Sequence, residues 1–157
     1  MKSLAVFSDT HHHSLPEAFY EVMESVDYVI FCGDGLSSLM PFAELYKDKF
    51  VYVKGNCDFS AKGPDKVILQ IEDVKVLVTH GHLYGVKSNT LNLKFAAEEQ
   101  GADLVLFGHT HANGVEKDGS VTYINAGSLG EGYLYGDGYY YVIINGKNIL
   151  AKFVKVY

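Results

Sequence analysis

Five short apolar segments of this chain each run into a polar motif built from aspartate, asparagine or histidine. In one of them, Leu104 to Phe107 are followed by Gly108 and then by two histidines, His109 and His111. A short apolar run that ends at a glycine is typical of a strand buried on both faces. The chain is therefore expected to place several aspartate, asparagine and histidine side chains at the ends of strands, where loops begin. The other four motifs are SDTH with Asp9 and His11, CGD with Asp34, GNCD with Asn56, Cys57 and Asp58, and THGH with His80 and His82.

The stretches between the first motifs predict crossover helices. Apolar residues from Leu15 to Val26 recur at helical spacing, and Ser14 with Glu17 has the pattern of a capping box. A second helix is predicted near Pro41 to Tyr46, before a third strand at Phe50 to Val53. Strand, crossover helix and strand in succession predict a parallel sheet with helices packed against it.

The second half of the chain predicts hairpins. Val67 to Ile71 and Val74 to Thr79 are separated only by Glu-Asp, which favours an antiparallel pair. The helix that precedes Leu104 is expected to end at Gly101. We find no linker or low-complexity tract, and we expect an α/β fold formed by a single domain over residues 1–157. Asp118-Gly119 and Asn145-Gly146 are strong hairpin signals, so antiparallel strands are predicted at residues 115–117, 121–125, 139–144 and 148–156.

The composition disfavours several classes of function. The net charge is -6, with 13 lysines and arginines and no basic run, so the chain lacks the electrostatic surface that carries nonspecific nucleic-acid binding. No window offers the roughly 18 apolar residues that a membrane helix needs, and the start of the chain is typical of a strand, not of a signal peptide. Cys32 and Cys57 lack the close, repeated spacing of a disulfide framework or a zinc knuckle. We therefore expect a cytoplasmic protein without a nucleic-acid or membrane partner.

The five motifs are expected to meet in one site, because open α/β sheets bind ligands at the carboxyl ends of their strands. Seven of their side chains, which are two carboxylates, one amide and four imidazoles, are more donors than one ion usually takes from a protein. Two divalent ions suit this set better, with a shared carboxylate bridging them about 3.5 to 4 Å apart. The nitrogen and oxygen donors favour Mn²⁺, with Ni²⁺, Fe²⁺, Co²⁺, Zn²⁺ or Mg²⁺ as alternatives. The predicted ligands are Asp9, His11, Asp34, Asn56, His80, His109 and His111.

The five motifs, DTH, GD, GNCD, THGH and GHTH in this order, resemble those of the calcineurin-like metallophosphoesterase superfamily, specifically its small single-domain phosphodiesterase branch. The resemblance covers nearly the whole chain. It implies a two-sheet β-sandwich flanked by helices in four layers, with a metal pair above the strand ends. By position it also implies that Asp9, His11 and His111 hold one ion, that Asn56, His80 and His109 hold the other, and that Asp34 bridges them.

The resemblance and the two-metal site together predict a dimetal-dependent hydrolase of phosphate esters, with a phosphodiesterase favoured over a phosphomonoesterase. A hydroxide between the two cations would attack phosphorus in line with the leaving group. Asn56 would also turn its amide N–H toward the phosphate, and Asp58 would orient a ligand histidine. Many members of the family have a histidine after the asparagine that protonates the leaving group, whereas this chain has Cys57. His82 is an alternative acid.

Two other functions compete with this prediction. One is a non-catalytic, metal-binding protein-interaction scaffold on the same fold, as in a trafficking subunit that resembles this family, and Tyr133 and Tyr135 would suit such an interface. Scaffold relatives tend to lose metal-binding histidines, whereas this chain has all of them, which favours the enzyme. The other is a nuclease, which the acidic charge disfavours. The expected partners are therefore a small phosphorylated substrate and, in a homo-oligomer, a second copy of the chain.

Overall fold

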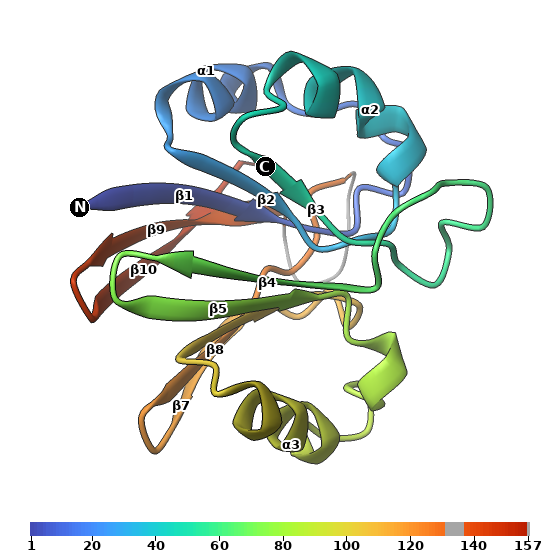
Figure 1. Cartoon of the computed structure of the whole chain (residues 1–157). Helices are drawn as coiled ribbons and strands as arrows, with labels where there is room; N and C mark the ends of the chain where they lie inside the picture. The colour runs from blue at the N-terminus through green and yellow to red at the C-terminus, as the bar shows by residue number, and fades with distance from the viewer. Residues whose placement is uncertain (131–136, 157) are drawn as a thin grey trace.

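Two β-sheets face each other, and helices cover their outer surfaces, in the computed structural model, which describes residues 1–130 and 137–156 (Figure 1). Within these residues each sheet has five strands. Helices α1 (Glu17–Ser25) and α2 (Leu36–Leu45) lie over one sheet, and α3 (Leu91–Gln100) lies over the other (Figure 1). The predicted two-sheet β-sandwich flanked by helices is confirmed.

The first sheet carries the parallel strands at the start of the chain. β1, β2 and β3 run parallel and are joined by α1 and α2, as the alternation of strand and helix predicts. β9 pairs antiparallel with β1, and β10 pairs antiparallel with β9, so the strand order is β10-β9-β1-β2-β3. The bounds of these strands are β1 (Lys2–Phe7), β2 (Tyr28–Phe31), β3 (Phe50–Tyr52), β9 (Gly138–Asn145) and β10 (Asn148–Lys155).

The second sheet contains the predicted hairpins. β4 and β5 form one antiparallel pair and β7 and β8 form another, while β6 runs parallel to both β5 and β8. The 3-10 helix η1 (His82–Tyr84) and α3 connect β5 to β6, and α3 ends at Gly101 as predicted. The strand order is β4-β5-β6-β8-β7, with bounds β4 (Lys66–Ile71), β5 (Val74–Thr79), β6 (Leu104–Phe107), β7 (Gly114–Asp118) and β8 (Val121–Asn125).

The apolar strands are buried on both faces because each parallel strand lies between the opposite sheet and a layer of helices. In β1, Leu4 and Val6 belong to the cluster between the two sheets, whereas Ala5 and Phe7 pack in the cluster under α1 and α2. All four side chains are fully buried. This enclosure explains the continuous apolar run, and it holds the carboxyl end of the strand in a fixed position.

The start of α1 differs from the prediction. The helix begins at Glu17 after Pro16, and this end has no side-chain capping hydrogen bond. The capping box predicted from Ser14 is therefore wrong. Pro16 supplies the non-helical backbone that precedes this helix, because the φ of proline is fixed near the required value. Among the described residues, no side-chain hydroxyl group accepts a hydrogen bond from the start of the helix.

The start of α2 also differs, because the helix begins at Leu36 and contains Pro41 in its interior. Asp58 explains the earlier start. Its carboxylate accepts hydrogen bonds from the backbone N–H groups of Gly35 (2.8 Å) and Leu36 (3.0 Å), which would otherwise be unpaired at the end of the helix. A cap supplied from a distant loop leaves no local signal in the sequence.

None of the helices within the described ranges combines the length and hydropathy needed to cross a lipid bilayer. Tyr133 and Tyr135, which the sequence offered as interface residues, lie outside the described residues. The expectation of a single domain over residues 1–157 stays a prediction.

Candidate metal centre

The five polar motifs meet at one edge of the sandwich, where β1, β2, β3, β5 and β6 end. Five of the seven predicted ligands have a φ between 47° and 72°, which is a backbone region that residues with a side chain rarely adopt. Such strain persists where the surrounding structure enforces it, and it is concentrated at functional sites. The five residues are Asp9, His11, Asp34, His109 and His111.

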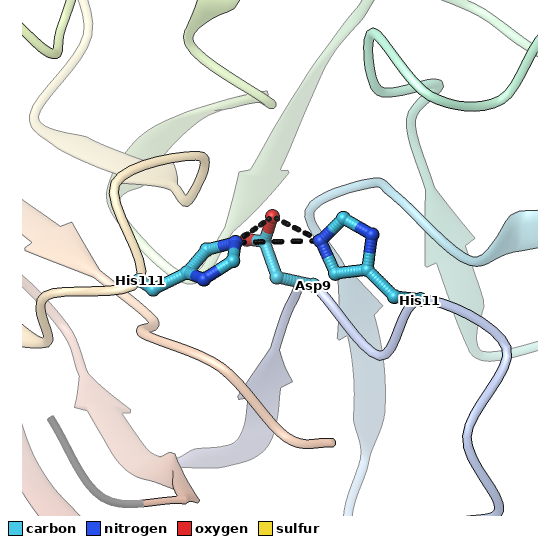
Figure 2. A group of neighbouring side chains, drawn as sticks. All are labelled: Asp9, His11 and His111. Atoms are coloured by element: carbon cyan, nitrogen blue, oxygen red, sulfur yellow. Dashed lines mark hydrogen bonds and ion pairs between the residues drawn. The ribbon is translucent and has the colours of Figure 1, made fainter. Parts of the chain in front are cut away.

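Asp9, His11 and His111 form the first group of donor atoms (Figure 2). The imidazoles of His11 and His111 lie on either side of the Asp9 carboxylate, with Nε2 atoms 3.6 Å and 3.3 Å from Asp9 Oδ1. The two Nε2 atoms are 3.3 Å apart. Three donors from two distant segments of the chain therefore point at one small volume.

The Asp9 carboxylate and the His11 imidazole of the first group shift each other's pKa values toward the charged forms. Burial acts to raise the pKa of Asp9, but the imidazoles of His11 and His111, with His80 and Ser8, outweigh it and hold this pKa well below its usual value. Asp9 in turn raises the pKa of His11. Asp9 is thus a buried carboxylate that stays ionised among imidazoles.

Two serines and a backbone amide orient Asp9. Ser8 Oγ and the His109 N–H donate to Asp9 Oδ2 at 2.6 Å and 3.0 Å, and Ser128 Oγ donates to the Asp9 carbonyl at 2.9 Å. A side chain on Gly108 would collide with Ser8 and Asp9, which explains the glycine of GHTH. The sequence predicts no role for Ser8, and for Ser128 it favours a turn without direct chemistry. The position of Ser8 inside the SDTH motif could have indicated its role, whereas Ser128 lies far away in the chain.

Asp34, His80 and His109 form the second group. His80 is fully buried, and its Nδ1 lies 2.7 Å from the Cys32 carbonyl. A carbonyl can only accept, so Nδ1 carries the proton and Nε2 offers its lone pair to the group when the ring is neutral. That Nε2 is 3.2 Å from Asp34 Oδ2 and 3.1 Å from His109 Nδ1.

The two histidines of the second group have opposite pKa shifts. Burial acts to lower the pKa of His80, but the carboxylates of Asp34 and Asp9 outweigh it and raise this pKa above its ordinary value. Burial, followed by the charges of His80 and Lys87, lowers the pKa of His109 to about 4. His109 is therefore a neutral ligand candidate over most of the physiological range.

Asp34 lies between the groups. Its Oδ2 is 3.2 Å from His80 Nε2 and 3.8 Å from His11 Nε2, and its Oδ1 accepts the Cys57 N–H at 2.8 Å. Asn56 joins the second group through Oδ1, which lies 3.0 Å from His80 Nε2. The seven predicted ligands are thus brought together, and their assignment to two ions stays a prediction.

Divalent cations fit these donors. Asp9 Oδ1 is buried and has no hydrogen-bond partner within the described residues, although imidazole nitrogens lie 3.3 to 3.9 Å away. Leaving such an oxygen unsatisfied is costly. A cation would satisfy the carboxylate and the imidazole lone pairs together, and mixed nitrogen and oxygen donors suit several divalent transition metals.

The comparison with known families agrees with this geometry. The family model described as the calcineurin-like phosphoesterase superfamily domain matches residues 1–148. This chain belongs to the calcineurin-like phosphoesterase superfamily. Members of the superfamily use divalent metals, and both groups of side chains offer the ligands for them.

Relatives within the superfamily are similar over most of the chain. A probable metallophosphoesterase of Bacillus subtilis, YsnB, is 39% identical over 132 residues, which cover 81% of this chain and 75% of that protein. The phosphodiesterase MJ0936 of Methanocaldococcus jannaschii is 31% identical over 154 residues, which cover 85% and 87%. A crystal structure of a predicted phosphoesterase from Streptococcus pneumoniae superposes with a TM-score of 0.83 at 29% identity and covers 98% of this chain and 89% of its own.

The structure of Vps29 from Entamoeba histolytica complexed with Zn²⁺ also superposes on this calcineurin-like chain, with a TM-score of 0.76 at 18% identity and 98% coverage of each chain. At this identity the likeness shows the fold alone. It gives no reason to transfer a role from Vps29.

Asp58 has a different role from the one predicted. We expected it to orient a ligand histidine. Its carboxylate instead accepts four backbone N–H groups at 2.8 to 3.0 Å. Asp58 therefore holds the backbone at Asp34, and it acts on the metal centre of this calcineurin-like chain through the loop and not through an imidazole. The four donors are Asp34, Gly35, Leu36 and Gly55.

Cys57 and His82, the two candidate acids, lie at the rim of the site. Cys57 is exposed, and burial together with the nearby Asp34 raises the pKa of its thiol. The His82 ring centroid is 5.4 Å from that of His80, and burial followed by the charge of His80 lowers the pKa of His82. Neither side chain is therefore a strong cationic acid at neutral pH.

Proposed function

We propose that this chain is a cytoplasmic, dimetal-dependent phosphodiesterase that hydrolyses a small phosphorylated compound. The observation that carries the proposal is the buried Asp9 carboxylate, whose Oδ1 accepts no hydrogen bond within the described residues and faces three imidazole nitrogens at 3.3 to 3.9 Å. Asp34 lies where a ligand shared by two ions would lie, because its Oδ2 faces a histidine of each group. Two divalent ions bound there would polarise the phosphate oxygens and lower the pKa of a water molecule between them.

The residues of the chain supply the geometry for this chemistry. His80 presents Nε2 because the Cys32 carbonyl holds its Nδ1. Asp9 keeps one oxygen directed at the imidazoles because Ser8 and the His109 N–H hold the other. Such preorganised donors need no rearrangement when charge develops on the phosphate, which is the usual source of electrostatic catalysis.

Asn56 is proposed to contact both the metal centre and the substrate. Its Oδ1 faces His80, while its Nδ2 points toward Cys57 Sγ at 3.5 Å. An amide has both an acceptor and donors, so the N–H₂ group is available to a phosphate oxygen at the rim of the site.

Cys57 is proposed as the proton donor to the leaving group, and His82 is the alternative. The raised pKa keeps the Cys57 thiol protonated at neutral pH, but a thiol is a weaker acid than an imidazolium. The site should therefore favour diesters whose leaving group needs little protonation. The names of two relatives, both called phosphodiesterases, agree with a diester substrate.

The test compares an aryl phosphodiester with the matching aryl monoester, using metal-free protein before and after the addition of Mn²⁺. We expect turnover only with Mn²⁺, and faster turnover of the diester. A faster monoester would change the proposed substrate class. Tight binding of Mn²⁺, Zn²⁺, Co²⁺ and Ni²⁺ without turnover of either ester would indicate the protein-interaction scaffold.

A further inference from the structure

A third cluster of potential metal ligands lies beside the first group. The donor atoms of His11, Asp34 and Cys57 all lie within 4.8 Å of one another. His11 and Asp34 already belong to the site described above, whereas no role in metal binding has been given to Cys57. The cluster therefore adds a sulfur ligand to a centre built from nitrogen and oxygen.

The surroundings of Cys57 suit a ligand that moves. Its backbone N–H is bound to Asp34 Oδ1 at 2.8 Å, so the residue is anchored against the metal site. Its side chain is exposed, and its Sγ accepts a hydrogen bond from the Asn56 side-chain amide at 3.5 Å. The thiol can therefore rotate about one side-chain bond without breaking the hydrogen bond that positions its backbone.

The first group of the site continues into this cluster through His11. Asp9 Oδ1 is fully buried, accepts no hydrogen bond within the described residues, and forms ion pairs with His11 Nε2 at 3.6 Å and His111 Nε2 at 3.3 Å. The same His11 nitrogen lies 3.8 Å from Asp34 Oδ2. His11 thus lies between the Asp9 carboxylate and the cluster that contains the thiol.

We propose that Cys57 is a ligand for thiophilic divalent ions such as Zn²⁺ and Cd²⁺, which bind at the outer side of the first group together with His11 and Asp34. The inference rests on the proposed metal function of this site. A tetrahedral zinc ion with sulfur and nitrogen ligands at about 2.3 and 2.1 Å requires donors about 3.5 Å apart. The three donor atoms lie within 4.8 Å of one another, so the Cys57 side chain would have to rotate to bring its sulfur into that range. On binding, the thiol proton leaves to solvent and the thiolate forms the bond to the ion.

With Cys57 as a ligand, the identity of the bound metal determines how tightly it binds and how fast the protein turns over substrate. Hard ions such as Mn²⁺ and Mg²⁺ prefer oxygen and nitrogen, so they leave Cys57 as a protonated thiol. An imidazole nitrogen binds one ion at a time, so a thiophilic ion bound to Cys57 takes His11 from the first ion, and only the Asp34 carboxylate can be shared. The Zn²⁺- or Cd²⁺-loaded protein is thus expected to hold its metal more tightly and to turn over more slowly than the Mn²⁺-loaded protein.

The test uses two variants that each keep one cysteine. Cys57→Ser removes the proposed ligand, and Cys32→Ala removes the buried cysteine, whose backbone carbonyl still holds His80. Metal-free wild type and both variants are titrated with Cd²⁺ while the sulfur-to-cadmium charge-transfer absorption is recorded in the ultraviolet. Mn²⁺ binding is measured in parallel by calorimetry, and circular dichroism verifies the fold.

We expect the band in wild type and in Cys32→Ala, with saturation at about one ion per chain. Cys57→Ser should lack the band and bind Cd²⁺ at least about tenfold more weakly, while its affinity for Mn²⁺ stays within about twofold. If Cys57→Ser does not fold, Cys57→Ala serves in its place. A band that persists without Cys57 overturns the inference.

The two proposals fail in different ways. Wild type that binds Mn²⁺ but gives no cadmium band overturns the role of Cys57 and leaves the metal centre intact. Wild type that binds neither ion overturns both.

Discussion

The two ends of the sandwich place different types of residue at positive φ angles. The metal end carries the five polar motifs, and the turn end, on the opposite side, carries the hairpin turns. At the metal end, positive φ angles occur at aspartate and histidine, as at Asp9 (55°) and His109 (72°). At the opposite end, the turns of β7–β8 and β9–β10 place glycine at positive φ, in Gly119 (60°) and Gly146 (61°), and the β4–β5 turn is the exception, with Glu72 (51°). Only glycine adopts this conformation without steric cost, and other residues lose roughly 1 to 2 kcal/mol each. The metal end therefore accepts strain to keep side chains that can bind a cation.

Strand β2 shows the same contrast with one residue type. Asp27 precedes the strand, is exposed, and accepts hydrogen bonds from Ser3. Asp34 follows the strand, is buried, and lies among histidines. One carboxylate serves the turn end and the other serves the metal end. Changes at the two ends should therefore separate metal binding from stability.

The largest effect is expected from replacing Asp34, with Asp27 as the matched control. Asp34→Ala should abolish binding of at least one ion and lower turnover by about 10³-fold, because several kcal/mol of charge stabilisation depend on the metals. Asp27→Ala should retain both ions and most of the activity. Calorimetry with Mn²⁺ and hydrolysis of the aryl diester measure the two variants. Full activity in Asp34→Ala would falsify the two-metal site.

A smaller effect is expected from Asp58→Asn. The amide presents N–H groups toward backbone donors that the carboxylate now accepts, which should cost about 1 to 3 kcal/mol in the free energy of unfolding. Because Asp58 holds the backbone of Asp34, metal affinity should also fall by about 10- to 100-fold. Denaturant unfolding and calorimetry measure both quantities.

Asp103→Asn is the matched change at the turn end. Asp103 precedes β6 and accepts the Lys75 N–H at 2.9 Å. This variant should lose less stability than Asp58→Asn and keep its affinity for Mn²⁺. Equal losses of metal affinity in the two variants would contradict the positioning role of Asp58.

A change confined to stability is expected at Gly119. Alanine at φ 60° should cost about 1 kcal/mol, which lowers Tm by about 2 to 4 °C in a chain of this size. No atom lies within 4 Å of the added methyl group, so the loss reflects the backbone alone. Gly119→Asn should lose less, because asparagine tolerates this conformation. Mn²⁺ affinity should be unchanged in both, and thermal unfolding with and without Mn²⁺ measures the difference.

The smallest effect concerns pH and the metal-free protein. All seven histidines of the chain lie in or beside the motifs of the metal end, so the shifted pKa values of His11, His80 and His109 report on that end. The folded-state pKa values of His11 and His80 are raised above 6.5, so their contribution to stability is present below pH 6.5 and is lost as the pH rises through the raised values. The pKa of His109 is lowered, so its contribution is lost as the pH falls from 6.5 toward about 4.

The metal-free protein should therefore be most stable near pH 6.5 and lose a few degrees in Tm toward alkaline pH. Thermal unfolding in the presence of a chelator measures this profile. His11→Gln should flatten the alkaline decline, and Mn²⁺ should remove it. An alkaline decline that is unchanged in His11→Gln would show that other groups cause it.

Much of the fold could be predicted because burial leaves a local pattern. The apolar run of β6 and the Asp118-Gly119 turn each carry their own signal, and both elements are present. The helix starts could not be predicted with the same success. α2 is capped by Asp58 from another loop, and the hydroxyl of Ser14 is not used to cap α1. Hydrogen bonds between distant segments leave no periodic trace in the sequence.

The sequence by itself determined which residue types stand at the strand ends, and hence the kind of chemistry and the family. Only the tertiary structure decided which of them meet. His11 and His111 are 100 residues apart and lie 3.3 Å from each other because two sheets align their carboxyl ends. The same packing sets the proton position on His80 and brings Cys57 beside Asp34. Residue type is a property of each position, whereas distances between remote positions depend on how the whole core packs.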